Sequence, residues 1–175
     1  MAKIIRTITS VIFGSYPQGA DGTVQPIEWE VLKQEGNKAL LISKNGLTQR
    51  RFDGKSNVWE NSEIRRWLKN NFMNTAFTDE EKAAILKTKL PDVGTTDKVF
   101  LLSSKEALTL YKSNEARRKT GINSLWWLRS PHSSYVYFAG IVDDFGDLIS
   151  TDVSSGYVGV SPALWVDLDS DVFKS

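Results

Sequence analysis

The chain has 175 residues, of which 41% are hydrophobic and 25% charged, and this is ordinary for one globular domain. Its 22 basic and 21 acidic residues leave a net charge of +1, so no strong field favours nucleic acid or an anionic membrane. The absence of cysteine excludes disulfides, thiolate metal sites and cysteine nucleophiles, and a single histidine excludes metal centres that need two imidazoles.

The first 45 residues are predicted to form strands. Residues 8–13 are rich in β-branched side chains and end at a turn signal, residues 14–17. Residues 27–32 alternate apolar and polar side chains, and residues 39–43 form a more continuous apolar run. Because Gly36-Asn37 separates these two runs, an antiparallel hairpin is predicted there.

The middle of the chain is predicted to be a loop, residues 46–60, followed by helices. Apolar residues recur at spacings of three and four from about Ser62 to residue 73, which predicts a helix. Capping boxes at residues 78–81 and 103–106 predict the starts of two more. Residues 99–102 are predicted to be a short buried strand. The basic run at 115–119 is interpreted as a solvated helix end rather than an anion site.

From Leu125 onward the pattern returns to strands and turns. Strands, then helices, then strands indicate an α+β fold, and the two strand-rich ends are predicted to join in one sheet. No linker divides residues 1–175, so a single domain is expected. Four tryptophans are expected in its core: Trp29, Trp67, Trp127 and Trp165.

Catalytic and metal-binding patterns are weak. His132 is the single imidazole and has no nucleophile-elbow sequence around it, so a surface-loop histidine is expected instead of a serine–histidine–aspartate site. Asp143, Asp144, Asp147 and Asp152 form an acidic cluster that lacks EF-hand spacing, and polar turn residues are favoured over calcium ligands. The chain is therefore expected to be non-enzymatic, with no metal and no cofactor.

Residues 130–164 have an unusual composition. These 35 positions contain no Lys, Glu, Gln, Met or Trp, although residues 1–129 contain 33 of them. Short strands and turns rich in Gly and Ser explain such a gap, and composition alone favours that explanation. The alternative is adenine-directed mutagenesis, because randomising the adenines of an AAC or AAT codon yields fifteen amino acids and misses these five.

The same segment has the composition of a binding surface. Tyrosine gives rigid contact area, whereas Ser, Gly and Asp give adaptable hydrogen bonds. Tyr135 and Tyr137 are expected to share one face of an extended strand, with Val136 on the other. The predicted ligand-binding residues are His132, Ser133, Ser134, Tyr135, Tyr137, Phe138, Asp143, Asp144, Phe145, Asp147, Ser154, Ser155 and Tyr157.

Several motifs together carry a family resemblance. They are IFGSYPQ (12–18), PIEW (26–29), ALLIS (39–43), WENS (59–62), RRWL (65–68), AF (76–77), WWLRSP (126–131) and GVSPALW (159–165). In order and spacing they resemble a bacterial and phage-associated family of domains of unknown function with a C-type lectin-like fold. Some members are variable proteins of diversity-generating retroelements. Ser161 stands where that family commonly has Arg, which removes one structural anchor.

The resemblance implies a lectin-like scaffold that displays a diversified segment, residues 130–164, between the two tryptophan-containing motifs. It therefore favours the mutagenesis explanation of the composition gap. The implied partner is a protein or cell-surface ligand, with self-association possible and neither nucleic acid nor membrane insertion expected. A fixed-specificity structural module of a phage particle or surface assembly is the alternative. No export signal is expected, because charged residues interrupt the first apolar positions, and a virion or a cell surface is the implied location.

Overall fold

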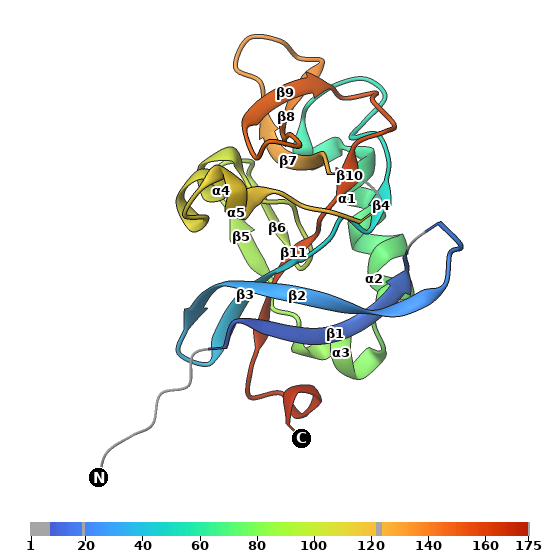
Figure 1. Cartoon of the computed structure of the whole chain (residues 1–175), viewed down its shortest axis with the longest axis vertical. Helices are drawn as coiled ribbons and strands as arrows, with labels where there is room; N and C mark the ends of the chain where they lie inside the picture. The colour runs from blue at the N-terminus through green and yellow to red at the C-terminus, as the bar shows by residue number, and fades with distance from the viewer. Residues whose placement is uncertain (1–7, 19, 122–123, 175) are drawn as a thin grey trace.

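The computed structural model describes residues 8–18, 20–121 and 124–174, which form two curled, mostly antiparallel sheets and a few short helices (Figure 1). The strands are β1 Ser10–Pro17, β2 Val24–Glu35, β3 Lys38–Ser43, β4 Thr48–Gln49, β5 Thr88–Leu90, β6 Thr95–Asp97, β7 Trp126–Pro131, β8 Phe138–Val142, β9 Leu148–Asp152, β10 Gly159–Val160 and β11 Ala163–Asp167. The helices are α1 Glu63–Trp67, α2 Met73–Ala76, α3 Asp79–Ala84, α4 Ser104–Leu110 and α5 Asn114–Arg117. The architecture is α+β, as predicted.

The first sheet has the order β1-β2-β3-β11 and lies in the lower half of Figure 1. The predicted hairpin is confirmed, since β2 and β3 pair antiparallel across Gly36 and Asn37. Strand β11 pairs with β3, so the prediction that early and late strands share one sheet is confirmed for β11. The other late strands, β7 to β10, form a second sheet with β4.

The turn predicted at residues 14–17 is wrong, because β1 continues through them with a bulge. Gly14 has a φ of +70°, and a Cβ there would come within 2.6 Å of the Phe77 ring. The Gly14 amide also donates to the Glu81 carboxylate at 2.9 Å. Glycine therefore bends the strand onto a helix instead of ending it.

The second sheet has the order β4-β10-β7-β8-β9 and contains one parallel pair, β7 with β10. Strands β7, β8 and β9 form an antiparallel meander. The β7–β8 loop, residues 132–137, and the loop after β9 therefore lie at one end of the meander. The β8–β9 loop, residues 143–147, lies at the other end.

The helices begin as the sequence predicts. Both capping boxes are present, at Thr78–Glu81 and Ser103–Glu106, and Ser62 caps α1. Residues 63–76 are continuously helical, with an unpredicted π-helical turn at Leu68–Phe72 between α1 and α2.

The strand predicted at residues 99–102 is wrong. Phe100 makes a single isolated bridge to Ala163, while β5 and β6 form the small ribbon just before it. Residues 99–102 are fully covered by the core without being in a sheet. A short apolar run signals burial, and periodicity alone does not say whether a strand is present.

The aromatic core is larger than predicted. Trp29 and Trp127 are fully buried, whereas Trp67 and Trp165 are only partly buried against the core. The core also holds Trp59 and Trp126, which the sequence did not single out.

The basic run at 115–119 is not a solvated helix end. Arg117 and Lys119 are 4% and 5% exposed, although Arg118 between them is exposed. The Arg117 guanidinium donates to the carbonyl oxygens of Gly146 and Ala107 at 2.9 and 3.3 Å. Buried cations of this kind need such acceptors, so the run joins the helices to the second sheet.

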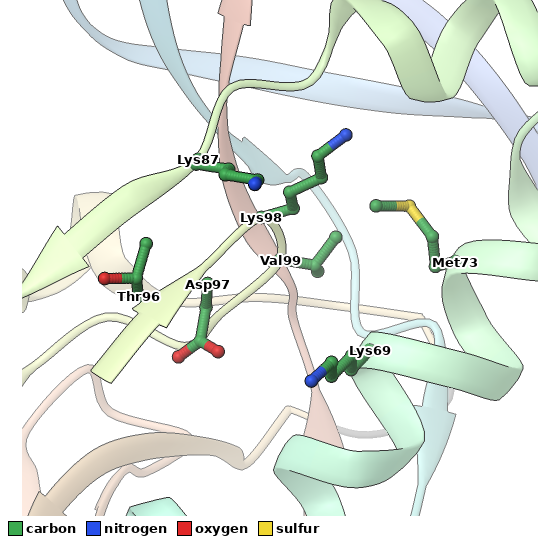
Figure 2. Close-up of a pocket in the computed structure, with 7 residues that line it drawn as sticks. All are labelled: Lys69, Met73, Lys87, Thr96, Asp97, Lys98 and Val99. Atoms are coloured by element: carbon green, nitrogen blue, oxygen red, sulfur yellow. The ribbon is translucent and has the colours of Figure 1, made fainter.

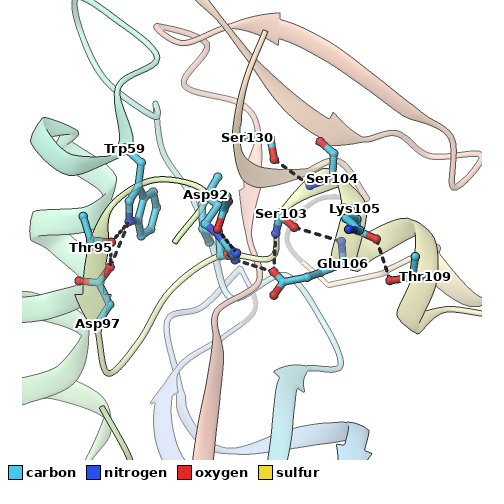
Figure 3. A network of polar contacts seen from close by, with 12 residues as sticks. Trp59, Asp92, Thr95, Asp97, Ser103, Ser104, Lys105, Glu106, Thr109 and Ser130 are labelled. Atoms are coloured by element: carbon cyan, nitrogen blue, oxygen red, sulfur yellow. Dashed lines mark hydrogen bonds and ion pairs between the residues drawn. The ribbon is translucent and has the colours of Figure 1, made fainter. Parts of the chain in front are cut away.

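Arg129 of the WWLRSP motif is buried and binds two carboxylates, those of Asp92 and Glu106, which are drawn in Figure 3. Its guanidinium donates twice to Asp92, at 3.0 and 2.8 Å, and at 2.5 Å to Glu106 of the α4 capping box. It also donates to the Leu101 carbonyl at 2.8 Å, which holds the covered segment in place. At the position lacking the expected arginine, the Ser161 hydroxyl donates to the Ser43 carbonyl at 2.9 Å.

In the described part of the chain, no helix is long and apolar enough to cross a membrane.

Candidate loop-cluster binding surface

Three loops meet at one end of the second sheet, and we call them the loop cluster: residues 50–58, 132–138 and 153–158. The Val153 amide donates to the Tyr137 carbonyl at 2.8 Å, and the Val153 carbonyl accepts from Phe52 at 2.9 Å. The backbone amide of Arg50 donates to the Val158 carbonyl at 3.1 Å. Backbone hydrogen bonds thus fix the three loops to one another.

Asn57 is the side chain that holds residues 132–138. It is only 6% exposed, and its amide group donates to the carbonyls of Tyr135 and Phe138 at 3.0 and 2.8 Å. Its backbone amide donates to the Val136 carbonyl at 2.8 Å. One residue outside the 130–164 segment therefore satisfies three carbonyls inside it.

His132 closes the same loop from within. Its Nδ1 accepts hydrogen bonds from the backbone amides of Ser134 and Tyr135 at 3.0 and 3.2 Å, so the proton of the neutral ring is on Nε2. Its ring lies 4.8 Å from that of Tyr135 and 6.3 Å from that of Phe138. His132 and Phe138 are half-buried, and they support the loop more than they contact solvent.

The extended strand expected at residues 135–137 is wrong, because these residues form a turn between β7 and β8. Tyr135, Val136 and Tyr137 do not alternate between two faces, and all three are about 60% exposed, at 61%, 59% and 60%. Ser133 and Ser134 beside them are exposed as well.

The loop after β9 adds polar groups to the cluster. The Asp152 carboxylate accepts from the backbone amide and hydroxyl of Ser154 at 2.8 and 2.6 Å, and these bonds lower its pKa. Tyr157 is 54% exposed, and hydrogen bonds with Thr151 and Ser155 lower its pKa. Ser154 is exposed and Ser155 half-buried, so the predicted contacts of this loop reach the surface.

The predicted residues Asp143, Asp144, Phe145 and Asp147 lie apart from the loop cluster. They occupy the other end of β8, and a strand of five residues spans about 17 Å. Phe145 and Asp144 are exposed there, next to α5. One continuous surface containing all thirteen predicted residues is therefore not formed.

Asp143 and Asp147 have structural partners. The Asp143 carboxylate accepts from the amides of Phe145 and Asp147, both at 2.9 Å, and Asp147 accepts from the Asn114 side chain at 2.5 Å. Gly146 has a φ of +82°, and a Cβ there would overlap the Asn114 carbonyl oxygen. Among the described residues, no group of three His, Asp or Glu side chains could hold a metal ion.

A separate cavity lies between the π-helical region and the β5–β6 ribbon (Figure 2). It has a volume of about 490 Å³ and is lined by three lysines, Lys69, Lys87 and Lys98, together with Met73, Thr96, Asp97 and Val99. Asp97 in its wall is paired with Arg65 at 2.9 Å, and the Lys98 amine reaches the Lys82 carbonyl at 3.3 Å. None of the predicted site residues lines it.

Sequence reasoning missed Asn57 and Val136. Asn57 lies in the polar centre of a predicted loop, where asparagine usually indicates a local turn. Its true partners are more than seventy residues away, so no local pattern could reveal them.

With the geometry in place, comparison with known protein families gives one match. A family described as a domain of unknown function (DUF6273) matches residues 36–168. The chain belongs to this family. The matched part of the DUF6273 domain contains the whole loop cluster, the Arg129 network and β11. Neither a curated protein nor a solved structure matches the chain.

Proposed function

We propose that this DUF6273 domain is a non-enzymatic recognition domain with a C-type lectin-like fold, and that the loop cluster binds its ligand. In this proposal it is the variable protein of a diversity-generating retroelement, and its ligand is a protein or a cell-surface molecule. The proposal joins the motif resemblance to the geometry of the second sheet.

The carrying observation is that the loop backbone is held chiefly by Asn57 and main-chain hydrogen bonds, with His132 and Asp152 as supporting side chains of the segment. Asn57 and main-chain hydrogen bonds fix residues 132–138 and 153–158, whereas Tyr135, Tyr137 and Tyr157 face solvent. A surface built this way tolerates many side chains on one backbone. Rigid aromatic anchors with small polar neighbours are also the composition that suits protein recognition.

The distribution of exposed apolar side chains supports the same surface. Ten large apolar side chains are exposed among the described residues, and six of them lie in residues 130–164. Four of these six belong to the loop cluster: Tyr135, Val136, Tyr137 and Tyr157. Exposed apolar groups that gather at one end of a sheet indicate a contact surface.

Sequencing residues 130–164 in sibling copies of the gene, together with a homologous template, tests the retroelement part. Differences confined to template adenines are expected. Differences scattered over all three codon positions and all bases would overturn it and leave a surface of fixed specificity.

A double substitution, Tyr135→Ala with Tyr137→Ala, tests the surface. We expect the melting temperature to stay within a few degrees, since exposed substitutions usually cost less than about 0.5 kcal/mol each. The matched control is Tyr111→Ala, whose side chain is 7% exposed and whose loss should cost about 3 kcal/mol. A similar loss for both variants would show that the exposed tyrosines are structural.

The alternative, a structural module of a phage particle or surface assembly, uses the same apolar side chains for contacts between copies. Analytical ultracentrifugation separates the two. A mass that rises with concentration and returns to that of a monomer in the double tyrosine variant supports the structural module.

A further inference from the structure

A basic depression lies at the edge of the loop cluster, between the segment after β4 and the helix of residues 63–76, and it shares Arg50 and Arg51 with the cluster. It has a volume of about 650 Å³. We call it the arginine basin, and it is lined by Arg50, Arg51, Glu63, Arg66, Trp67, Asn70 and Asn71.

Only one of the three guanidinium groups has its charge matched within the basin. Arg51 donates twice to the Glu63 carboxylate, at 2.6 and 2.8 Å, in a bidentate pair. The nearby carboxylate of Asp53 is already bonded to the backbone amides of Lys55, Ser56 and Glu63. Arg50 and Arg66 form no ion pair with a carboxylate among the described residues, although the charges of Glu63 and Asp53 act on them from further away.

The Arg50 guanidinium is held in place but makes no hydrogen bond to a described residue. Its guanidinium carbon lies 4.9 Å from the centre of the Trp67 ring, and its Nε is buried with no hydrogen bond. A buried donor without a partner is costly, so such a group favours the binding of an acceptor. Burial also lowers the pKa of Arg50, and the nearby Glu63 charge offsets this only in part.

The other donors of the basin are also available. Arg66 uses one nitrogen, which donates to the Asn61 carbonyl at 3.0 Å. Asn70 and Asn71 lie on the π-helical turn Leu68–Phe72, and their side chains have no hydrogen-bond partner among the described residues. π-Helical turns are rare and are frequently found at functional sites.

We propose that the arginine basin binds a tetrahedral oxyanion, a phosphate or sulfate group, through Arg50, Arg66 and the two asparagine amides. A carboxylate is satisfied by one guanidinium fork in its own plane. Two forks and two amides offer more donors than two carboxylate oxygens accept, whereas a tetrahedral oxyanion presents a third and a fourth oxygen. This site goes beyond the proposed function, because its residues lie outside the 130–164 segment.

The test titrates the intact chain with sodium phosphate and with sodium sulfate at constant ionic strength, using sodium acetate as the carboxylate comparison. Binding is followed by the Nε–H resonances of the arginines in ¹H–¹⁵N spectra. We expect saturable shifts of the Arg50 and Arg66 resonances with phosphate or sulfate, and shifts at least tenfold weaker in apparent affinity with acetate. A preference between phosphate and sulfate distinguishes the two sources of the oxyanion.

The variants are Arg50→Lys, which keeps the charge but loses the fork, and Arg66→Gln, which changes an exposed position. Each should weaken binding at least tenfold without changing the melting temperature by more than a few degrees. The control is Lys112→Gln, which removes an exposed charge between α4 and α5, on the other side of the molecule from α1 (Figure 1). Shifts that do not saturate, equal affinity for acetate, or equal losses in the control would overturn the proposal. Because no tyrosine is altered, these outcomes are independent of the ligand-surface tests.

Discussion

Replacing Lys119 with methionine should stabilise the protein. The amine of Lys119 is buried between the first sheet and the second, where it donates to the Ser43 carbonyl at 2.8 Å. It lies 5.0 Å from the Trp126 ring centre and 5.9 Å from that of Tyr111. No carboxylate among the described residues forms an ion pair with it, although the charge of Glu30 acts on it from further away.

Burial lowers the pKa of Lys119 from 10.5 to about 8, and the expected stabilisation can be worked out from this shift. The difference corresponds to about 3 kcal/mol against the charged form at neutral pH. Contact with the Trp126 and Tyr111 rings offsets part of this cost, since a desolvated cation over a ring gains about 2 kcal/mol. Methionine fills a similar volume without a charge, and the Ser43 carbonyl keeps the Ser161 hydroxyl at 2.9 Å. We therefore expect the variant to gain about 1–2 kcal/mol at pH 7.

The pH dependence gives a second readout. Between pH 8 and 10 the unfolded chain keeps the Lys119 proton while the folded protein releases it, so the free energy of unfolding rises with pH. Burial also raises the pKa of Tyr111. Above pH 10 the unfolded chain therefore loses the tyrosine proton that the folded protein retains, and the free energy of unfolding falls. Denaturant unfolding at pH 7, 8, 9 and 10 should thus show a rise in the wild type and none in Lys119→Met.

The control is Lys112→Met, which removes an exposed lysine and should keep the wild-type pH profile. A flat wild-type profile from pH 8 to 10 would refute the reasoning. So would a Lys119→Met variant less stable than the wild type at pH 7, because it would show that the hydrogen bond and the rings outweigh the cost of burial.

Two further substitutions test the loops. Gly146→Ala should lower the free energy of unfolding in urea by more than about 2 kcal/mol, since the φ of Gly146 is +82° and a Cβ would overlap the Asn114 carbonyl. The control, Gly36→Ala, should cost less, because nothing lies within reach of a Cβ there. Asn57→Ala should cost about 2 kcal/mol and speed amide exchange in residues 132–138, because the carbonyls of Tyr135 and Phe138 each lose one of their two donors. Unchanged exchange in that variant would show that main-chain bonds alone hold the loop.

The sequence predicts the parts of the fold that local chemistry determines. A two-residue Gly-Asn turn and two capping boxes are complete within four residues or fewer, and all three are present. Gly14 is different, because its role depends on the Phe77 ring and the Glu81 carboxylate, more than sixty residues away. The burial of Lys119 likewise depends on strand β3, which no local pattern relates to a basic run.

The candidate site was predictable in composition but not in arrangement. The exposed aromatic side chains of residues 132–157 are where the sequence places them. Their division into two groups follows from the length of β8, since loops joined by one strand lie at its opposite ends. Asn57 was missed for the same reason as the role of Gly14, because its partners are distant in sequence.

Burial changes how the composition gap of residues 130–164 should be weighed. Thirteen of the 35 positions are buried, among them Gly140, Ile141 and Val153, and burial disfavours Lys, Glu and Gln there, although it does not disfavour Met or Trp. For Lys, Glu and Gln the gap is therefore informative chiefly at the 22 remaining positions, which are accessible to solvent to some degree and on which charged side chains are ordinarily common. It persists at all of them. If mutagenesis made the gap, sibling copies must differ at accessible positions such as Tyr135 and Tyr157 and keep the buried ones. Charged replacements at Ile141 or Val153 would be incompatible with the sheet that carries the surface.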